Sequence, residues 1–215
     1  MRAAIEGRDA ASLRAILAKQ KWAKVRDGQG FTLLHWAALL AWAEGVRELV
    51  AAGAEVDAAS AEGYTALHCA AFCGDSDSAG LLLAAGAALE ARSRRASTPL
   101  LLAAQCGRGA KALLEQLVAR RADLNVSGFR DRTPIQLAVV AHGDAGVVQL
   151  LANAGADVRA ANAALQRLTP LHTAAHLGRC GGRRGQPRPA ARPWLSPSPQ
   201  RCAPLPGLGV LTERR

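Results

Sequence analysis

Short apolar runs at helical spacing recur along the first part of the chain. In the stretch TALHCAAFCG, the side chains of Leu67, Ala70 and Ala71 follow the i, i+3, i+4 spacing that places them on one face of a short helix. Gly74 follows this run and can adopt the left-handed conformation that ends a helix. A second, leucine-rich run over residues 81–83 comes next. The pattern predicts pairs of short helices, and one pair is too small to bury its apolar face alone.

These helix pairs recur with a period of about 33 residues. The runs FTLLHWAA, YTALHCAA, STPLLLAA, RTPIQLAV and LTPLHTAA carry threonines that are separated by 33, 33, 35 and 36 residues. A second signature follows each of the first four runs: LVAAGAEVD, LLAAGAALE, LVARRADLN and LLANAGADV. Two linked signatures that recur together indicate structural repeats. The threonines are Thr32, Thr65, Thr98, Thr133 and Thr169.

The chain resembles the ankyrin-repeat family, whose repeat of about 33 residues is a β-turn plus two helices with a T-P-L-H-x-A signature. The resemblance extends from about Ala3 to Gly178. It implies an all-α fold, an ankyrin-repeat solenoid with a β-turn and a helix-turn-helix in each repeat. The expected units are a partial N-terminal capping repeat (1–26), ankyrin repeats 1 to 4 (27–59, 60–92, 93–127 and 128–163), a truncated repeat 5 (164–178) and a disordered tail rich in Pro, Arg and Gly (179–215).

Some repeats depart from the family pattern at glycine sites. Ala41 stands where the family has the glycine between the two helices, and Arg121 replaces the glycine that closes the third repeat. Arg121 is expected to be mildly strained if its φ is positive. Gly45 lies inside a second helix, where glycine costs about 1 kcal/mol relative to alanine. Because the third to fifth repeats also carry inserted residues, we expect lower stability there.

The positive charge of the chain is concentrated at one end. The net charge is +10, but residues 179–215 contain eight arginines and one acidic residue, Glu213, and so account for +7. The same segment holds seven of the ten prolines and shows no helical or strand period, which predicts disorder. The change in composition after Gly178 suggests an alternative or mis-joined C-terminus of a longer protein. The high charge therefore describes the tail and not the repeats.

Other bulk features favour an intracellular protein, cytoplasmic or nuclear. Five cysteines form no tight framework, which indicates free thiols in a reducing compartment. The start of the chain has no long apolar run typical of a secretory signal. No segment reaches the roughly 20 apolar residues of a membrane span. We expect a monomer that does not associate with membranes.

Histidine and cysteine cluster in the stretch GYTALHCAAFCGD. His68, Cys69 and Cys73 lie close together, but their spacing lacks the four ligands of a structural zinc site. The resemblance assigns His35, His68 and His172 to a hydrogen bond with the threonine of their turn, and Cys69 aligns with mostly apolar residues. No nucleophile–base set or phosphate loop indicates an enzyme, and no metal or cofactor is expected. The expected structural motif residues are Thr32, His35, Thr65, His68, Thr98, Thr133, Thr169 and His172.

The resemblance implies a scaffold or adaptor that binds another protein through its turn tips and the concave face of its first helices, with no small-molecule substrate. Aromatic residues in the first two repeats and arginines in the next two are types enriched at binding hot spots. They predict a partner with an apolar anchor facing the first two repeats and acidic residues facing the next two. The expected contact residues are Phe31, Leu39, Glu62, Tyr64, Phe72, Arg94, Arg95, Gln105, Phe129, Arg130 and Arg132.

An alternative function is association of a nucleic acid or another acidic polymer with the arginine-rich tail. A disordered basic segment can neutralise phosphates without reading a sequence. Against this alternative, the tail has one aromatic residue, Trp194, and no recognisable RNA-binding module. A protein is therefore the favoured partner, and nucleic acid the less favoured one.

Overall fold

Helices make up all the regular elements in the part of the chain that the structure, a computed structural model, describes: residues 7–17, 25–106, 110–128, 131–141, 145–160 and 169–170. The all-α class is thus confirmed. The helices are α2 (Ala10–Leu17), α3 (Leu33–Leu39), α4 (Ala43–Ala51), α5 (Ala66–Cys73), α6 (Ser76–Ala84), α7 (Pro99–Gln105), α8 (Ala110–Ala119), α9 (Pro134–Ala141) and α10 (Ala145–Asn153). The predicted tail and most of the predicted truncated repeat lie outside the described residues.

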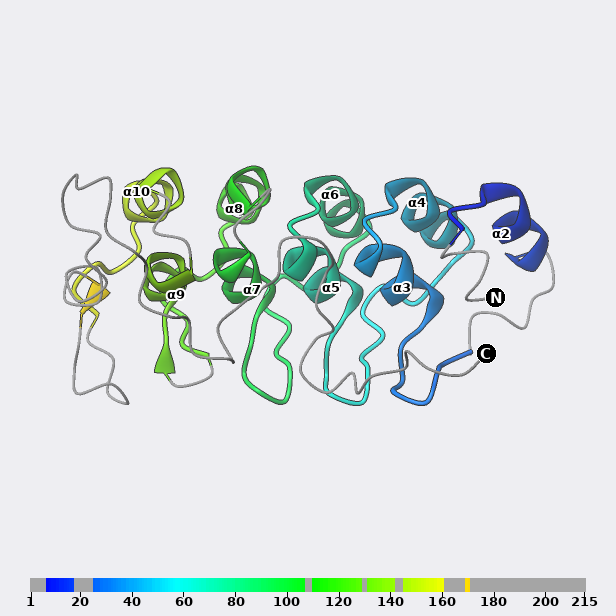
Figure 1. Cartoon of the computed structure of the whole chain (residues 1–215), viewed down its shortest axis with the longest axis horizontal. Helices are drawn as coiled ribbons and strands as arrows, with labels where there is room; N and C mark the ends of the chain where they lie inside the picture. Colours follow the sequence, from blue (N-terminus) through cyan, green and yellow to red (C-terminus); the bar gives the residue numbers. More distant parts are fainter. Residues whose placement is uncertain are drawn as a thin grey trace, which may run out of the picture.

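The helices form two rows, as a solenoid of helix pairs requires. α3, α5, α7 and α9 lie side by side in one row, here called the inner helices, and α2, α4, α6, α8 and α10 form the outer row (Figure 1). Each helix contacts its neighbour in the same row, and each inner helix contacts the outer helix that follows it. Extended loops project from the inner row, away from the outer row (Figure 1). We call these loops fingers 1 to 4; they comprise residues 27–32, 60–65, 93–98 and 128–133, of which 129 and 130 are not described.

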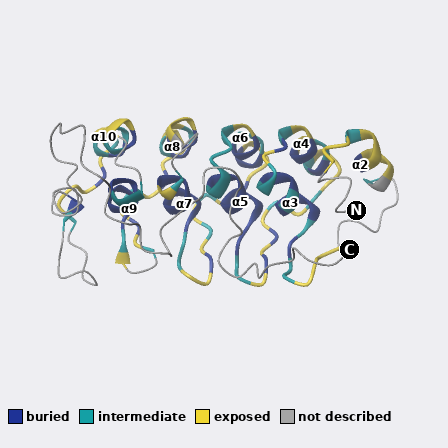
Figure 2. Cartoon of the chain, viewed as in Figure 1, coloured by how far each residue is buried: buried dark blue, intermediate teal, exposed yellow. Residues whose placement is uncertain are grey.

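Small side chains let the inner helices approach closely. Ala70 and Ala71 of α5 are fully buried, and the alanine pairs 37–38 and 103–104 of the neighbouring helices are equally inaccessible. Figure 2 shows the inner helices as mostly buried, with exposed residues concentrated on the outer helices and the loops. Cys69 is also fully buried, as predicted, and burial raises the pKa of its thiol. Cys69 is therefore a small core residue and not a reactive thiol.

The N-terminal unit packs onto the first repeat through α2. Leu13 of this helix is fully buried, while Arg14 forms an ion pair of 2.7 Å with Glu48 of α4. Asp9 accepts a hydrogen bond from the N–H of Ala11 and so caps the start of the helix. The helix therefore begins at Ala10, directly after this aspartate. The described part of this unit therefore contacts α4, the outer helix of the first repeat.

The two residues that replace a glycine of the family pattern both have positive φ. Ala41 has φ 50° and Arg121 has φ 64°, so the strain predicted for Arg121 is confirmed. An L-residue in this left-handed region costs about 1–2 kcal/mol relative to its right-handed conformation. These two residues therefore keep the backbone path of the repeat without the glycine that would relax it.

Gly45 inside α4 is explained by the packing of Trp42. The indole of Trp42, which directly precedes the helix, is 6% exposed. A Cβ on Gly45 would lie 2.2 Å from the indole ring, far below a normal contact. The loss of helix propensity noted in the sequence is therefore tolerated because the ring occupies the space that a side chain would need.

Gly45→Ala is expected to destabilise the chain by about 1 kcal/mol, because overpacking costs about 1–3 kcal/mol and exceeds the helix-propensity gain of about 1 kcal/mol. In a Trp42→Ala background, the same substitution should instead be stabilising by about 1 kcal/mol. Urea unfolding of the four proteins measures this change of sign. An equal effect of Gly45→Ala in both backgrounds would show that the Trp42 ring is not the reason for a glycine at this site.

Candidate partner-binding surface

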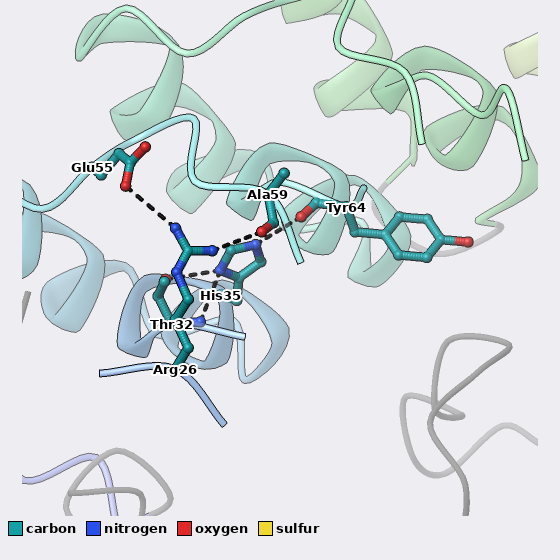
Figure 3. Close-up of polar contacts among 6 residues, drawn as sticks. All are labelled: Arg26, Thr32, His35, Glu55, Ala59 and Tyr64. Atoms are coloured by element: carbon teal, nitrogen blue, oxygen red, sulfur yellow. Dashed lines mark hydrogen bonds and ion pairs between the residues drawn. The ribbon is translucent and has the colours of Figure 1, made fainter. Parts of the chain in front are cut away.

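The threonine–histidine pair of the first repeat joins finger 1 to finger 2. The backbone N–H of Thr32 donates to Nδ1 of His35 at 3.1 Å, and the threonine hydroxyl lies 2.8 Å from the same nitrogen. Nε2 of His35 lies 2.8 Å from the carbonyl oxygen of Tyr64. Because Nδ1 accepts the Thr32 N–H, Nε2 carries the proton and donates to that carbonyl. Figure 3 shows the imidazole between its own turn and the backbone of Tyr64.

The second repeat uses the same arrangement. Nδ1 of His68 accepts the N–H of Thr65 at 3.1 Å and lies 2.9 Å from its hydroxyl, and Nε2 lies 2.9 Å from the carbonyl oxygen of Ser97. The local pairing predicted for His35 and His68 is confirmed. The bond from each histidine to the next finger was not predicted. The recurrence of histidine at the same place in successive repeats was the sequence feature that could have indicated it.

Gln136 occupies the histidine site of the fourth repeat and reproduces both bonds. Its Oε1 accepts the N–H of Thr133 at 3.1 Å, and its Nε2 donates to the carbonyl oxygen of Ala160 at 2.9 Å. The side chain is buried. An amide therefore does the work of the imidazole here, because it offers one acceptor and one donor in similar places.

The third repeat has an apolar contact instead. Leu101 stands at the histidine site, and Gly128 stands where fingers 2 and 3 have Ser60 and Ser93. Each of those serine hydroxyls accepts a backbone N–H of its own finger, at 3.1 and 3.2 Å. A Cβ on Gly128 would lie 2.6 Å from Cδ1 of Leu101, so the leucine fills the space that the missing side chain leaves. The two substitutions compensate for each other sterically.

Further polar side chains link the repeats at the turn that ends each outer helix. A carboxylate or amide oxygen in one repeat accepts a backbone N–H of the next repeat in three successive junctions. The acceptor–donor pairs are Asp57–Ala88, Glu90–Asp123 and Asn125–Asp157, with N···O distances of 2.8, 2.9 and 2.8 Å. Arg26, which precedes finger 1, donates a bond of 2.8 Å to the carbonyl oxygen of Ala59 and forms an ion pair of 3.4 Å with Glu55, and so ties the start of the first repeat to its end (Figure 3).

Burial keeps the two described signature histidines neutral. It lowers the pKa of His35 to about 4 and also lowers the pKa of His68. Both ring nitrogens of each histidine are occupied by hydrogen bonds, so metal binding would break the contact between fingers. Among the residues that the structure describes, no group of three or more His, Cys, Asp or Glu side chains is placed to hold a metal ion. No helix in the same residues is long and apolar enough to cross a membrane.

The structure corrects the prediction that Phe31 and Tyr64 face a partner. Their residues are only 4% and 3% exposed. The ring of Phe31 meets the imidazole of His35 edge-on at a centroid distance of 5.2 Å, and that of Tyr64 meets His68 at 5.7 Å. In these two repeats, the aromatic residue before the threonine therefore shields the histidine from water, which is a structural role.

The other predicted residues are distributed over the fingers and the inner helices. Arg94, Arg95 and Gln105 are exposed, Leu39, Glu62, Phe72 and Arg132 are partly exposed, and Phe129 and Arg130 lie outside the described residues. Among the motif residues, Thr98 and Thr133 are buried, Thr169 is partly exposed and His172 is not described. The Thr98 hydroxyl accepts the N–H of Leu101 at 3.4 Å and so caps α7.

Comparison with protein families agrees with this architecture. The family model described as Ankyrin repeats (3 copies) matches residues 1–93, and the model described as Ankyrin repeat matches residues 130–163. Together these matches cover more than half of the chain. The chain belongs to the ankyrin-repeat family. A comparison with curated proteins returns no match.

The most distinctive charged feature of this ankyrin solenoid is finger 3. Arg94, Arg95 and the preceding Arg92 are all exposed, and none forms an ion pair with the described residues. The finger is fixed to its neighbour, because the N–H of Arg94 donates to the carbonyl oxygen of Glu62 at 2.9 Å. Three arginines on a turn with a fixed backbone form a local basic surface. The sequence analysis predicted Arg94 and Arg95 as contact residues but did not include Arg92.

Proposed function

We propose that this chain is a non-enzymatic scaffold or adaptor that binds a partner protein through its fingers and the exposed side of its inner helices. Ankyrin repeats are in general protein–protein interaction modules. The observation that carries the proposal is the basic surface of Arg92, Arg94 and Arg95 on finger 3, three exposed cations without an ion-pair partner in the described residues. A monomeric intracellular protein, cytoplasmic or nuclear, is part of the proposal.

Partly exposed apolar residues on the inner helices of the first two repeats support a mixed interface. Leu39 and Phe72 lie near the ends of α3 and α5, and both pack against the core while remaining partly accessible. These helix ends are adjacent, since the Cys73 thiol donates to the carbonyl oxygen of Leu39 at 3.1 Å. With Phe31 and Tyr64 buried, Leu39 and Phe72 are the apolar contacts that remain in the first two repeats. The partner should therefore place acidic residues at finger 3 and an apolar side chain at these helix ends.

The double substitution Arg94→Glu and Arg95→Glu is expected to weaken partner binding about tenfold or more, because it places like charges opposite an acidic surface. Proteins captured by the immobilised full-length parent chain are compared with those captured by the variant. The affinity of each protein that the variant loses is then measured directly, at low and at high salt. The affinity of the parent chain should fall as salt rises, and that of the variant should change much less.

A matched control carries the same charge change on the outer helices. Arg47 of α4 and Lys111 of α8 are exposed, so Arg47→Glu with Lys111→Glu alters the net charge equally on the other row. This control should retain the captured proteins and their affinities. If both double variants bind the same proteins equally well, finger 3 is not part of the interface and the proposal fails.

A further inference from the structure

Ser97, near the end of finger 3, follows a cluster of arginines in the sequence. Arg92, Arg94 and Arg95 lie five, three and two residues ahead of it in the segment RSRRAS. Arginines at the second and third residues before a serine are the pattern that basophilic protein kinases select, since acidic pockets beside the kinase active site pair with them. All three guanidinium groups are exposed and form no ion pair with the described residues.

Of the three hydroxyl residues in finger 3, only Ser97 has a side chain free of a structural role. The hydroxyl of Ser93 accepts the N–H of Ser97 at 3.2 Å, and this serine is buried. Thr98 is also buried and caps α7 through its hydroxyl. Ser97 itself is partly exposed, and its hydroxyl makes no hydrogen bond with the described residues. Its backbone alone is committed, as the acceptor of the His68 bond.

The folded turn restricts access to Ser97 and must open for a kinase, which binds its substrate in an extended form. The turn is closed by the N–H of Ser93 to the carbonyl oxygen of Ser97 at 3.0 Å, and by the N–H of Ala96 to the carbonyl oxygen of Ser93 at 2.9 Å. Ala96 has φ 54°, where fingers 1 and 2 have glycine. Because this strain is released when the turn opens, finger 3 opens at a lower cost than a glycine-containing finger would.

We propose that Ser97 is a phosphorylation site of a basophilic protein kinase, and that the phosphate switches off the basic surface of finger 3. The Ser97 oxygen attacks the γ-phosphorus of ATP, a new O–P bond forms, the bond to the β–γ bridging oxygen breaks, and ADP leaves. The hydroxyl proton passes to the catalytic carboxylate of the kinase. The phosphate adds a charge of about −1.5 to −2 and so cancels about half to two thirds of the charge of the three arginines.

This switch rests on the proposed function, because it acts on the same partner surface. Phosphorylation of Ser97 is expected to weaken an acidic partner about tenfold, as the Arg94→Glu and Arg95→Glu variant does. The phosphorylation itself requires no partner. It can therefore succeed or fail independently of whether the chain is a scaffold.

The test is to incubate the full-length chain with ATP and the catalytic subunit of a basophilic kinase, and to map the phosphate by mass spectrometry. Phosphate should appear at Ser97 and be absent there in Ser97→Ala. Arg94→Gln with Arg95→Gln should slow the reaction about tenfold or more. Ser93→Ala removes the hydrogen bond to the Ser97 N–H and should accelerate it. Phosphate on Ser93 instead, or on Ser97 only in a peptide of residues 90–100, would overturn the site.

Ala96→Gly separates access from sequence preference. It relaxes the closed turn, so Ser97 in the full-length chain should be phosphorylated more slowly, while the rate on the matching peptide stays unchanged. The same slowing on the peptide would show that the kinase reads residue 96 directly and would refute the opening step. A Ser97-phosphorylated chain that binds the partner from the capture experiment as tightly as the unmodified chain would refute the switch.

Discussion

Acidification from pH 7 to about pH 4 is expected to lower the free energy of unfolding by about 3 kcal/mol through His35 alone. The pKa of this histidine is about 4 in the folded chain, against 6.5 for a free side chain, mainly because the ring is buried. Between these values the unfolded chain binds a proton that the folded chain does not. The contribution is therefore fully present above about pH 6.5 and is lost as the pH falls toward 4. His68, whose pKa is also lowered by burial, acts in the same direction.

The chain itself supplies the variant that tests this expectation. Gln136 forms the same two hydrogen bonds as a histidine but cannot be protonated in this range. His35→Gln should therefore keep the stability at pH 7 within about 1 kcal/mol and remove about 3 kcal/mol of the pH dependence. Urea unfolding from pH 7 to pH 4 measures both quantities.

The reciprocal variant is the control for the other titrating groups. Gln136→His places an imidazole at the same buried site and should add a pH dependence of the same sign. Carboxylates that titrate near pH 4 affect all three proteins alike and cancel in the comparison. If the parent chain and His35→Gln lose stability in parallel as the pH falls, the buried histidine is not the cause.

The fold was predictable because its determinants are local and repeated. The alanine pairs, the threonine before each inner helix and the apolar run in each outer helix recur at a nearly constant period, and stacking follows from that period. The burial of Ala70 and Ala71 and the bond between Thr65 and His68 confirm these assignments. The strain at Arg121 could be foreseen as well, since only the backbone path of the repeat determines it.

The candidate surface was less predictable because it depends on contacts between repeats. Phe31 and Tyr64 precede the threonine, where other repeats have Ser97 and Arg132, so no apolar pattern marks that site as buried. The role of Gln136 was hard to predict because glutamine and histidine are different residue types. Their side chains nevertheless offer one acceptor and one donor at similar places. The role of Gln136 becomes visible only when the segment after its repeat is in place, because its second bond is to Ala160.

Gly30→Val is expected to destabilise the chain by about 3 kcal/mol, because two costs add at the tip of finger 1. Gly30 has φ 78°, and a Cβ there would lie 2.9 Å from the backbone nitrogen of Ala61. That N–H donates to the carbonyl oxygen of Gln29 at 2.9 Å, so a side chain would also force fingers 1 and 2 apart. Thermal and urea unfolding measure the loss. A change below about 1 kcal/mol would mean that the fingers are not held in register by this contact.

Ala96→Gly is the reciprocal substitution at the equivalent site of finger 3, and it should stabilise the chain. Ala96 has φ 54°, and an L-residue there costs about 1–2 kcal/mol. The greater freedom of glycine in the unfolded chain offsets about 0.4–1 kcal/mol of that relief, which leaves a net gain of roughly 0.5–1 kcal/mol. Opposite signs for Gly30→Val and Ala96→Gly in the same unfolding experiment would show that finger stability is set by the left-handed residue at the tip. A neutral or destabilising Ala96→Gly would instead mean that finger 3 has adapted to its alanine and stores no strain, which would also remove the reason for its easier opening around Ser97.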